Sequence, residues 1–120
     1  ASLAEGLGLP IAEAIMAKLP ICTNFWGGHK SLLTRGGFVE IEHEEIIQPF
    51  TSDLAFYAEG QKCAYSSPQE IAKSIKVFIN TSMSERKKMA FAAKKNFLKT
   101  YGRENTLKNI HSRILEISKK

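Results

Sequence analysis

The clearest alternation of apolar and polar positions lies in the second half of the chain. Apolar residues recur there three and four positions apart, which is the spacing that places side chains on one face of an α-helix. This pattern predicts three helices, over residues 68–80, 84–100 and 104–118. The stripes expected to be buried are Ile71, Ile75, Phe78 and Ile79 in the first helix, Met89, Ala93 and Phe97 in the second, and Leu107, Ile110, Ile114 and Leu115 in the third.

Residues that favour helix ends support these boundaries. Ser67, Pro68 and Glu70 have the order of an N-cap, a first-turn proline and a capping-box acid at the third position, so two hydrogen bonds are expected between Ser67 and Glu70. Ser84 is the predicted N-cap of the second helix. Gly102 is predicted to end it.

The first forty residues predict short elements joined by tight loops, because they contain six of the eight glycines. Pro10 favours the first position of a helix, and the apolar spacing after it predicts a helix over about 10–17. The apolar run 20–23 predicts a short buried strand, followed by a loop over 24–28. A loop, a helix, a strand and a second loop form one unit of an α/β fold.

The pattern over residues 29–60 is less regular. Alternation of apolar and polar residues over 38–42 predicts a half-exposed strand. Residues 45–49 are a candidate for another strand, stopped by Pro49. Residues 52–58 are interpreted as a short helical turn or an excursion, closed by Gly60.

Length and composition limit the class of protein. A chain of 120 residues with 43% hydrophobic residues is long enough for a single domain, with a C-terminal helical segment over about 68–118. No apolar run approaches the roughly 18–20 residues that span a bilayer. Cys22 and Cys63 form no C-x-x-C pattern, so we expect a cytoplasmic protein with reduced thiols.

Charge is divided unevenly along the chain. Residues 1–60 hold three Lys and Arg against eight acids, a net charge of −5, whereas residues 61–120 hold fourteen against four, a net charge of +10. A basic helical segment is either a surface for an anionic partner or a solvated helix face, and the sequence leaves both open. The clusters Arg86-Lys87-Lys88 and Lys94-Lys95 carry much of this charge.

The loop before residue 10 has the composition of an anion site. A helix that begins at Pro10 directs its free amide groups and the positive end of its dipole toward this loop. Gly6 and Gly8 lack a Cβ, so a ligand can approach the main chain. Glu5 and Glu13 flank the loop and are able to accept hydrogen bonds from sugar hydroxyls. Together these features predict a sugar-nucleotide site, although solvated surface acids remain the alternative.

The same residues resemble a known signature. The segment Glu5-Gly-Leu-Gly-Leu-Pro-Ile-Ala-Glu13-Ala-Ile-Met-Ala-Lys-Leu-Pro20-Ile is similar to the E-x7-E motif of the C-terminal lobe of GT-B glycosyltransferases, especially family 4, usually written E-G-F-G-L-P-x-x-E-A-M-A-x-G-x-P-V. Residues 27–33 and 57–64 resemble the G-H-x-x-x-L and G-Q-K-W-A segments of a family-4 subgroup. The resemblance covers nearly the whole chain, and its most specific part is residues 5–24.

The resemblance implies a fold and an activity. The chain is expected to be α/β, a partial Rossmann-like C-terminal lobe with a parallel sheet and C-terminal helices. The full-length enzyme is expected to transfer a hexose from a nucleotide-diphosphate sugar to an acceptor with retention, without a metal or other cofactor. The counterpart of Glu5 contacts the donor hexose, and the counterpart of Glu13 holds the ribose hydroxyls. The remaining implied donor-binding positions are Gly6, Leu7, Gly8 and Leu9.

The chain departs from the family pattern at several positions. Lys18 stands where the family has the glycine that ends the helix, which costs about 1 kcal/mol if that geometry is kept. Leu7 replaces a phenylalanine and Cys63 a tryptophan. The basic residues that neutralise the diphosphate, and the whole N-terminal lobe with its acceptor site, would precede Ala1. We therefore expect the isolated chain to be inactive, as a fragment, a truncated gene product or a split subunit.

Two other functions remain open. The first is a noncatalytic sugar-nucleotide-binding or partner-binding subunit that completes a GT-B enzyme in trans. The second is a basic helical module for nucleic acid or a membrane, favoured only by residues 84–120. The expected partners are a nucleotide-sugar donor, the missing N-terminal lobe in cis or in trans, and a membrane surface contacted peripherally by the basic helices. Nucleic acid is not an expected partner.

The individual aromatic, histidine and cysteine side chains provide little further evidence for a function. Trp26 is interpreted as packing. His29 either donates to a phosphate or caps a turn, and both readings remain open. His43 and His111 have no partners at metal-ligand spacing, and Cys22 is expected to be an inert core residue.

Overall fold

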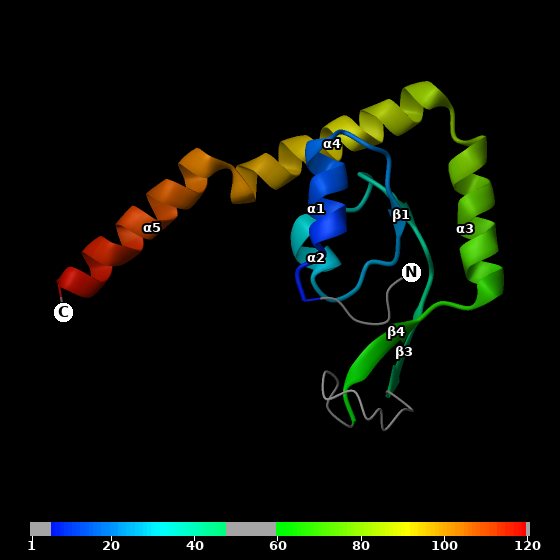
Figure 1. The fold of residues 1–120 in the computed structure, drawn as a ribbon, viewed down its shortest axis with the longest axis horizontal. Coiled ribbons are helices and arrows are strands. Elements are labelled where there is room, and N and C mark those ends of the chain that lie inside the picture. Colours follow the sequence, from blue (N-terminus) through cyan, green and yellow to red (C-terminus); the bar gives the residue numbers. More distant parts are fainter. Residues whose placement is uncertain (1–5, 48–59, 120) are drawn as a thin grey trace.

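The computed structural model describes residues 6–47 and 60–119 (Figure 1). It is a mixed α/β structure with a small parallel sheet and C-terminal helices, which confirms the predicted class. The predicted excursion at residues 52–58 lies outside the described residues. In chain order the elements are α1 (Leu9–Met16), β1 (Cys22–Thr23), α2 (His29–Leu32), β2 (Val39–Glu40), β3 (Glu44–Ile47), β4 (Lys62–Tyr65), α3 (Pro68–Asn80), α4 (Met83–Tyr101) and α5 (Arg103–Ser118).

The parallel sheet consists of β1 and β2. Cys22 is opposite Val39 and Thr23 is opposite Glu40. Strands that run in the same direction need a crossover connection. The segment that contains the one-turn helix α2 supplies it. The strands predicted over 20–23 and 38–42 therefore exist, although each is only two residues long.

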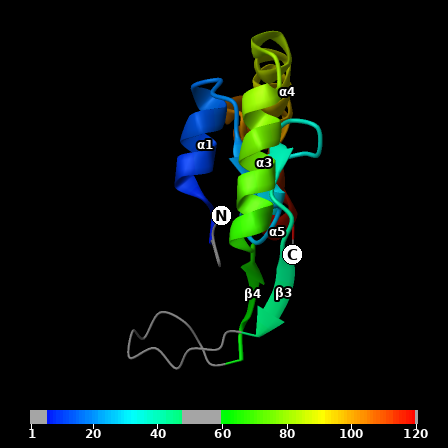
Figure 2. The same cartoon turned by 90° about the vertical axis from the view of Figure 1, so that its right-hand side faces the viewer.

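β3 and β4 form an antiparallel hairpin that projects from the rest of the molecule (Figures 1 and 2). Glu44 is opposite Tyr65, and Ile47 is opposite Lys62. β3 covers residues 45–47 of the candidate strand at 45–49, and the predicted stop at Pro49 lies outside the described residues. The sequence pattern does not predict β4, because its two adjacent central residues, Cys63 and Ala64, are both buried and no alternation results.

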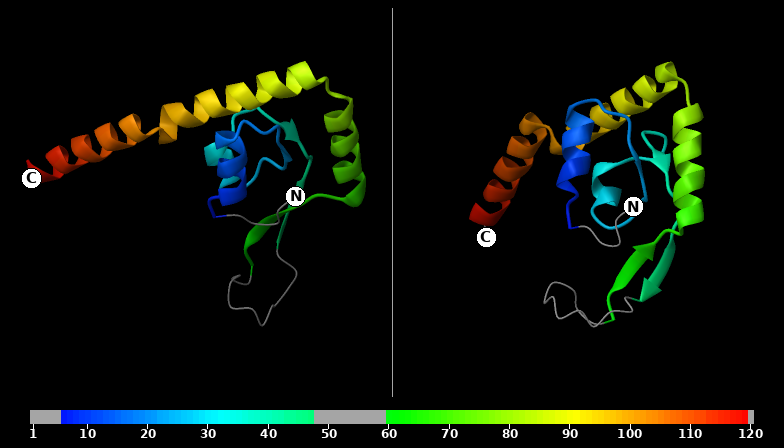
Figure 3. Two further views of the ribbon diagram at one scale, coloured as in Figure 1. Left: turned by 45° about the horizontal axis from the view of Figure 1, so that its top comes forward. Right: turned by 45° about the vertical axis from the view of Figure 1, so that its right-hand side comes forward.

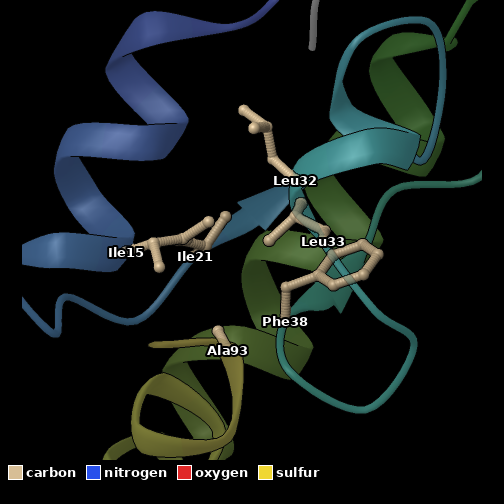
Figure 4. Packing of buried hydrophobic residues seen from close by; sticks show 6 residues of the cluster. All are labelled: Ile15, Ile21, Leu32, Leu33, Phe38 and Ala93. Atoms are coloured by element: carbon tan, nitrogen blue, oxygen red, sulfur yellow. The ribbon is translucent and has the colours of Figure 1, made fainter. Parts of the chain in front are cut away.

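The hydrophobic core lies between α1, α4 and the parallel strands (Figure 4). The side chains come from different elements and point toward one another in the close-up view. The ring of Phe38 stacks on Phe25, with 5.6 Å between the ring centroids. The buried cluster consists of Ile15, Ile21, Leu32, Leu33, Phe38 and Ala93.

The N-cap of α4 lies two residues earlier than predicted, and the helix begins at Met83. Ser82, not Ser84, is its N-cap: the Glu85 amide donates to Ser82 Oγ over 3.2 Å, and the Ser82 amide donates to the Glu85 carboxylate over 3.3 Å. The reason is the residue three positions on, because Ser82 has an acid there whereas Ser84 has Lys87, which cannot accept a hydrogen bond. The predicted apolar face of α4 and its end at Gly102 are confirmed.

α3 has the predicted bounds and the predicted cap. The amide of Glu70 donates to Ser67 Oγ over 3.2 Å. The reciprocal half of the expected capping box is replaced by another contact, because the Glu70 carboxylate lies 3.4 Å from Lys73 Nζ. The structure thus contains one of the two predicted hydrogen bonds at this helix end.

The buried face of α3 is rotated from the predicted one. Ser74 is buried and its hydroxyl donates to the carbonyl oxygen of Glu40 over 3.1 Å, which attaches the helix to β2. Ile71 and Phe78 are half-buried, but Ile75 and Ile79 are exposed. The small Ser74 side chain and its hydrogen bond allow the helix to approach the sheet along a face that apolar spacing alone does not identify.

α5 has nearly the predicted bounds but buries none of its side chains. It extends away from the other elements (Figures 1 and 3), and the stripe expected to be buried is 45–59% exposed. Because the described elements provide no surface against this stripe, the prediction of burial is wrong. The radius of gyration is 17.4 Å, compared with about 14 Å for a compact domain of this length.

Lys18 adopts the left-handed conformation that the glycine of the family pattern would favour. Its φ is 57°, and the amides of Lys18 and Leu19 donate to the carbonyl oxygens of Ile15 and Ala14, over 3.1 and 2.9 Å, at the end of α1. Lys18 Nζ also lies 4.6 Å from the centroid of the Phe91 ring.

Lys18→Gly is therefore expected to raise the free energy of unfolding by about 0.5–1 kcal/mol, since relief of backbone strain outweighs the loss of an exposed cation–π contact. Urea denaturation measures the change. Lys18→Ala keeps the strain and loses the contact, so it should be no more stable than the wild type. If the alanine variant gains as much as the glycine variant, backbone strain is not the cause.

Candidate functional site

The glycine loop, residues 6–8, leads directly into α1. Gly8 is the N-cap, in the left-handed conformation with φ 80° and ψ 54°. Pro10 occupies the second helical position instead of the first, because the helix begins at Leu9. The amides of Ile11 and Ala12 both donate to the Gly8 carbonyl oxygen, over 2.9 and 3.1 Å. Proline has no amide hydrogen, so the donors of this end that no carbonyl oxygen of the described residues accepts from are the amides of Gly8 and Leu9.

The outer side of the loop is accessible. Leu7 is 49% exposed and Leu9 is 62% exposed. Gly8, between them, is buried and lies against His29 and Leu32. The loop is therefore exposed at Leu7 and Leu9 and covered at Gly8.

A second glycine segment, Gly27-Gly28, packs against the glycine loop. A Cβ added to Gly28 would stand 2.3 Å from the carbonyl oxygen of Gly6 and 2.8 Å from the Cα of Leu7. Such distances are shorter than any real contact of a Cβ atom, so only glycine permits this approach of two backbones. The loop predicted over residues 24–28 is thus packed directly against the loop predicted as the ligand site.

Buried polar side chains gather at the carboxyl end of β1. The described part of the chain has four buried polar residues. Three of them lie at this strand end: Thr23, Asn24 and His29. His29 Nδ1 lies 3.1 Å from the carbonyl oxygen of Asn24 and 3.4 Å from Thr23 Oγ1. Ligands of parallel α/β sheets bind outside the carboxyl ends of the strands. The cluster therefore lies where a ligand of such a sheet is expected.

Sequence reasoning did not identify Thr23 and Asn24 as part of the site. The signal for them was present, because two polar residues directly follow an apolar run at the predicted strand end. For His29, the structure favours the interpretation as a residue that holds a turn, since Nδ1 faces the backbone of the preceding loop. A hydrogen bond from its other nitrogen to a phosphate stays untested.

The structure describes only one of the two acids of the predicted pair. Glu13 is exposed on the second turn of α1. Glu5 lies outside the described residues, so the separation of the two carboxylates is not given by the structure. Their joint action on the hydroxyls of one ligand stays a prediction.

Other chemistry-bearing side chains lie apart from the loop. Lys30 Nζ is 5.0 Å from the centroid of the Trp26 ring, and the His43 ring meets the same indole edge to face, with 5.8 Å between the ring centroids. Burial raises the pKa of the Cys22 thiol, which keeps it protonated and unreactive. No group of three or more His, Cys, Asp and Glu residues suited to a metal ion occurs within residues 6–47 and 60–119.

Concave regions of the described surface lie away from the glycine loop. A hollow of about 820 Å³ follows the bend between α3 and α4 and is lined by Lys73, Lys76 and Glu85 among others. A smaller one of about 190 Å³ lies beside His43, Tyr65 and Glu70. The first is a broad depression between exposed helix faces, and neither includes the cluster at β1. None of the described helices is long and apolar enough to cross a membrane.

Comparison of the chain with protein-family models, with curated proteins and with solved structures finds no match. The residues of this chain and the geometry that surrounds them are therefore what indicates its function. The class that these define is an α/β domain with an exposed glycine loop at a helix N-terminus.

Proposed function

We propose that the chain is the donor-binding region of a retaining GT-B glycosyltransferase of family 4, with a partial Rossmann-like fold. The observation that supports this most is the position of the glycine loop. Gly6 and Leu7 are exposed, the loop leads into the N-terminus of α1, and Gly8 packs against His29 beside the carboxyl end of a parallel strand. Glycine loops at such a place bind the phosphates of nucleotides in α/β folds.

In this proposal each part of the loop has a role. The amides of Gly8 and Leu9 donate hydrogen bonds to the diphosphate and, with the positive end of the α1 dipole, stabilise its negative charge as it becomes the leaving group. The carboxylate of Glu13 accepts hydrogen bonds from the ribose hydroxyls, and that of Glu5 from the donor hexose. Gly6 and Leu7 place their backbone beside the sugar. No metal is required in this proposal, because the loop amides and the basic residues of the family's diphosphate site together stabilise the negative charge.

The isolated chain is proposed to bind a donor without transferring it. Sugar transfer also needs an acceptor site and further positive charge near the diphosphate, and the resemblance places both in other parts of the enzyme. A robust transfer reaction catalysed by the purified chain alone would refute this part. The partner is then the complementary lobe, in cis or in trans.

Sugar-nucleotide binding tests the proposal directly. Glu13→Gln is expected to weaken binding of UDP-glucose or GDP-mannose at least tenfold, because a hydrogen bond to a charged group contributes about 1.5–3 kcal/mol. Glu5→Gln is expected to act in the same direction. Isothermal calorimetry with the full chain measures both. Glu104→Gln is the matched control, since it is another exposed acid in the first turns of a helix, and it should bind as the wild type does.

The same variants distinguish the donor-site proposal from the alternative of a basic helical module. Salt-sensitive binding to DNA, RNA or anionic vesicles that survives Glu5→Gln and Glu13→Gln, without any sugar-nucleotide binding, would favour that alternative. Peripheral contact with a membrane and a cytoplasmic location stay predictions. If neither sugar nucleotide binds the wild-type chain, the donor-site proposal is wrong.

A second candidate function is a partner-binding subunit of a split GT-B enzyme. The exposed apolar stripe of α5 favours it, because an isolated domain rarely leaves such a stripe without a covering surface. Copurification of the chain with a protein that resembles an N-terminal GT-B lobe, lost in an Ile110→Asp variant, would support it. A monomer that binds donor sugars but retains no such protein would favour the first proposal.

A further inference from the structure

His29 connects the glycine loop with the strand end beneath it. Its side chain is 4% exposed. On one edge of the ring, Nδ1 lies 3.1 Å from the carbonyl oxygen of Asn24. On the other edge, a Cβ added to Gly8 would stand 2.8 Å from Cδ2 and 3.2 Å from Nε2. The ring therefore fills the space between the loop and the carboxyl end of β1.

The contacts of Nδ1 determine how the ring is held. A carbonyl oxygen only accepts hydrogen bonds, so Nδ1 carries the proton that is donated to Asn24. Thr23 Oγ1 lies 3.4 Å from the same nitrogen and limits rotation of the ring further. Both contacts come from the strand end, which belongs to the core. The edge that faces Gly8 is thus fixed by two contacts with the strand end.

Gly8 needs such support. Its φ of 80° is one of many conformations open to a glycine, and the direction of the Gly8 and Leu9 amides depends on it. Donors that are already oriented before a ligand arrives bind it more tightly than donors that must first be ordered. Gly28 contributes in the same way, because it brings the turn that carries His29 against Gly6 and Leu7.

We propose that His29 is a positioning residue of the donor site: its ring, held by Asn24, keeps Gly8 in the left-handed conformation that directs the loop amides at the diphosphate. This inference rests on the proposed function for its ligand. It assigns to the buried polar cluster a role that the E-x7-E segment alone does not contain.

The test uses His29→Asn in the full chain. Its side-chain amide donates from nearly the position of Nδ1, so the hydrogen bond to Asn24 is kept while the ring edge beside Gly8 is removed. Amide NMR spectra of the ligand-free protein are expected to show displaced signals for Gly8 and Leu9. UDP-glucose and GDP-mannose affinities are expected to fall at least tenfold. Phe38→Leu, a core substitution away from the loop, is the control and should leave both readouts unchanged.

The outcomes separate a positioning role from a purely structural one. Unchanged Gly8 and Leu9 signals, unchanged affinity of His29→Asn, or an equal loss of affinity in Phe38→Leu would each overturn the inference. If the wild-type chain binds neither sugar nucleotide, the proposed function fails, and the ligand-free amide signals still decide whether His29 holds the loop. If His29→Asn does not fold, His29→Leu, which fills similar volume without a ring, is measured by the same criteria.

Discussion

Gly28→Ala is expected to lower the free energy of unfolding by about 3 kcal/mol. The added Cβ would meet backbone atoms of the glycine loop, the nearest of them only 2.3 Å away. Backbone atoms cannot turn aside as the end of a long side chain does, so the two loops have to separate. The φ of Gly28 is −59°, which any residue adopts, so the whole effect comes from contact and none from backbone strain. Urea denaturation followed by circular dichroism measures it.

Gly6→Ala is the matched control for this prediction. A Cβ at Gly6 would have no heavy atom of the described residues within 4 Å, so the change in unfolding free energy should stay within about 0.5 kcal/mol. Gly28→Ala is also expected to abolish sugar-nucleotide binding where the chain remains folded, because the loop is displaced. Equal stabilities of the two variants would mean that the glycine segments do not touch.

The helices could be predicted from the sequence because their signals are local. Apolar spacing and the Ser67 cap placed α3 to the residue, and Gly102 placed the boundary between α4 and α5. The cap of α4 was misplaced for a local reason as well, since the choice between Ser82 and Ser84 depends on which of them has an acid three residues later. Glu85 therefore identifies Ser82 as the N-cap by the same local capping-box rule.

The faces that the helices bury could not be predicted in the same way. Apolar spacing identifies a stripe, but the partner surface decides whether it is covered. Ser74 faces β2 in place of the larger Ile75, and the Ile110 stripe meets no described surface. β4 was not predicted because its two central residues, which point to opposite faces, are both buried and no alternation results. These features depend on residues far apart in the sequence, which a local pattern does not contain.

The candidate site likewise has a part that local sequence predicts and a part that depends on residues distant in the sequence. The glycine loop and its helix were predictable, since Gly6, Gly8 and Pro10 are consecutive features of one segment. The support beneath it was not, because Gly28 and His29 reach the loop only through the turn that follows β1. The predicted pairing of Glu5 with Glu13 remains a prediction until binding is measured.

Ala93→Leu is expected to lower the free energy of unfolding by about 2 kcal/mol. Ala93 is 1% exposed and belongs to the core cluster between α4 and α1. A Cβ added to Gly37 would stand 3.3 Å from the Cβ of Ala93, so the backbone before β2 already lies close to this face of the helix. Three additional carbon atoms have no space there, and overpacking of this kind costs about 1–3 kcal/mol.

Ala92→Leu separates the contact from the properties of the helix. Ala92 is exposed on the same turn, and leucine has nearly the helix propensity of alanine, so its effect should stay within about 0.5 kcal/mol. Thermal and urea denaturation of both variants measure the difference. α4 is also held to α1 by a hydrogen bond from Lys94 Nζ to the carbonyl oxygen of Met16 (2.7 Å), so displacement of α4 should disturb the helix that follows the glycine loop. Equal stability of Ala92→Leu and Ala93→Leu would place α4 elsewhere.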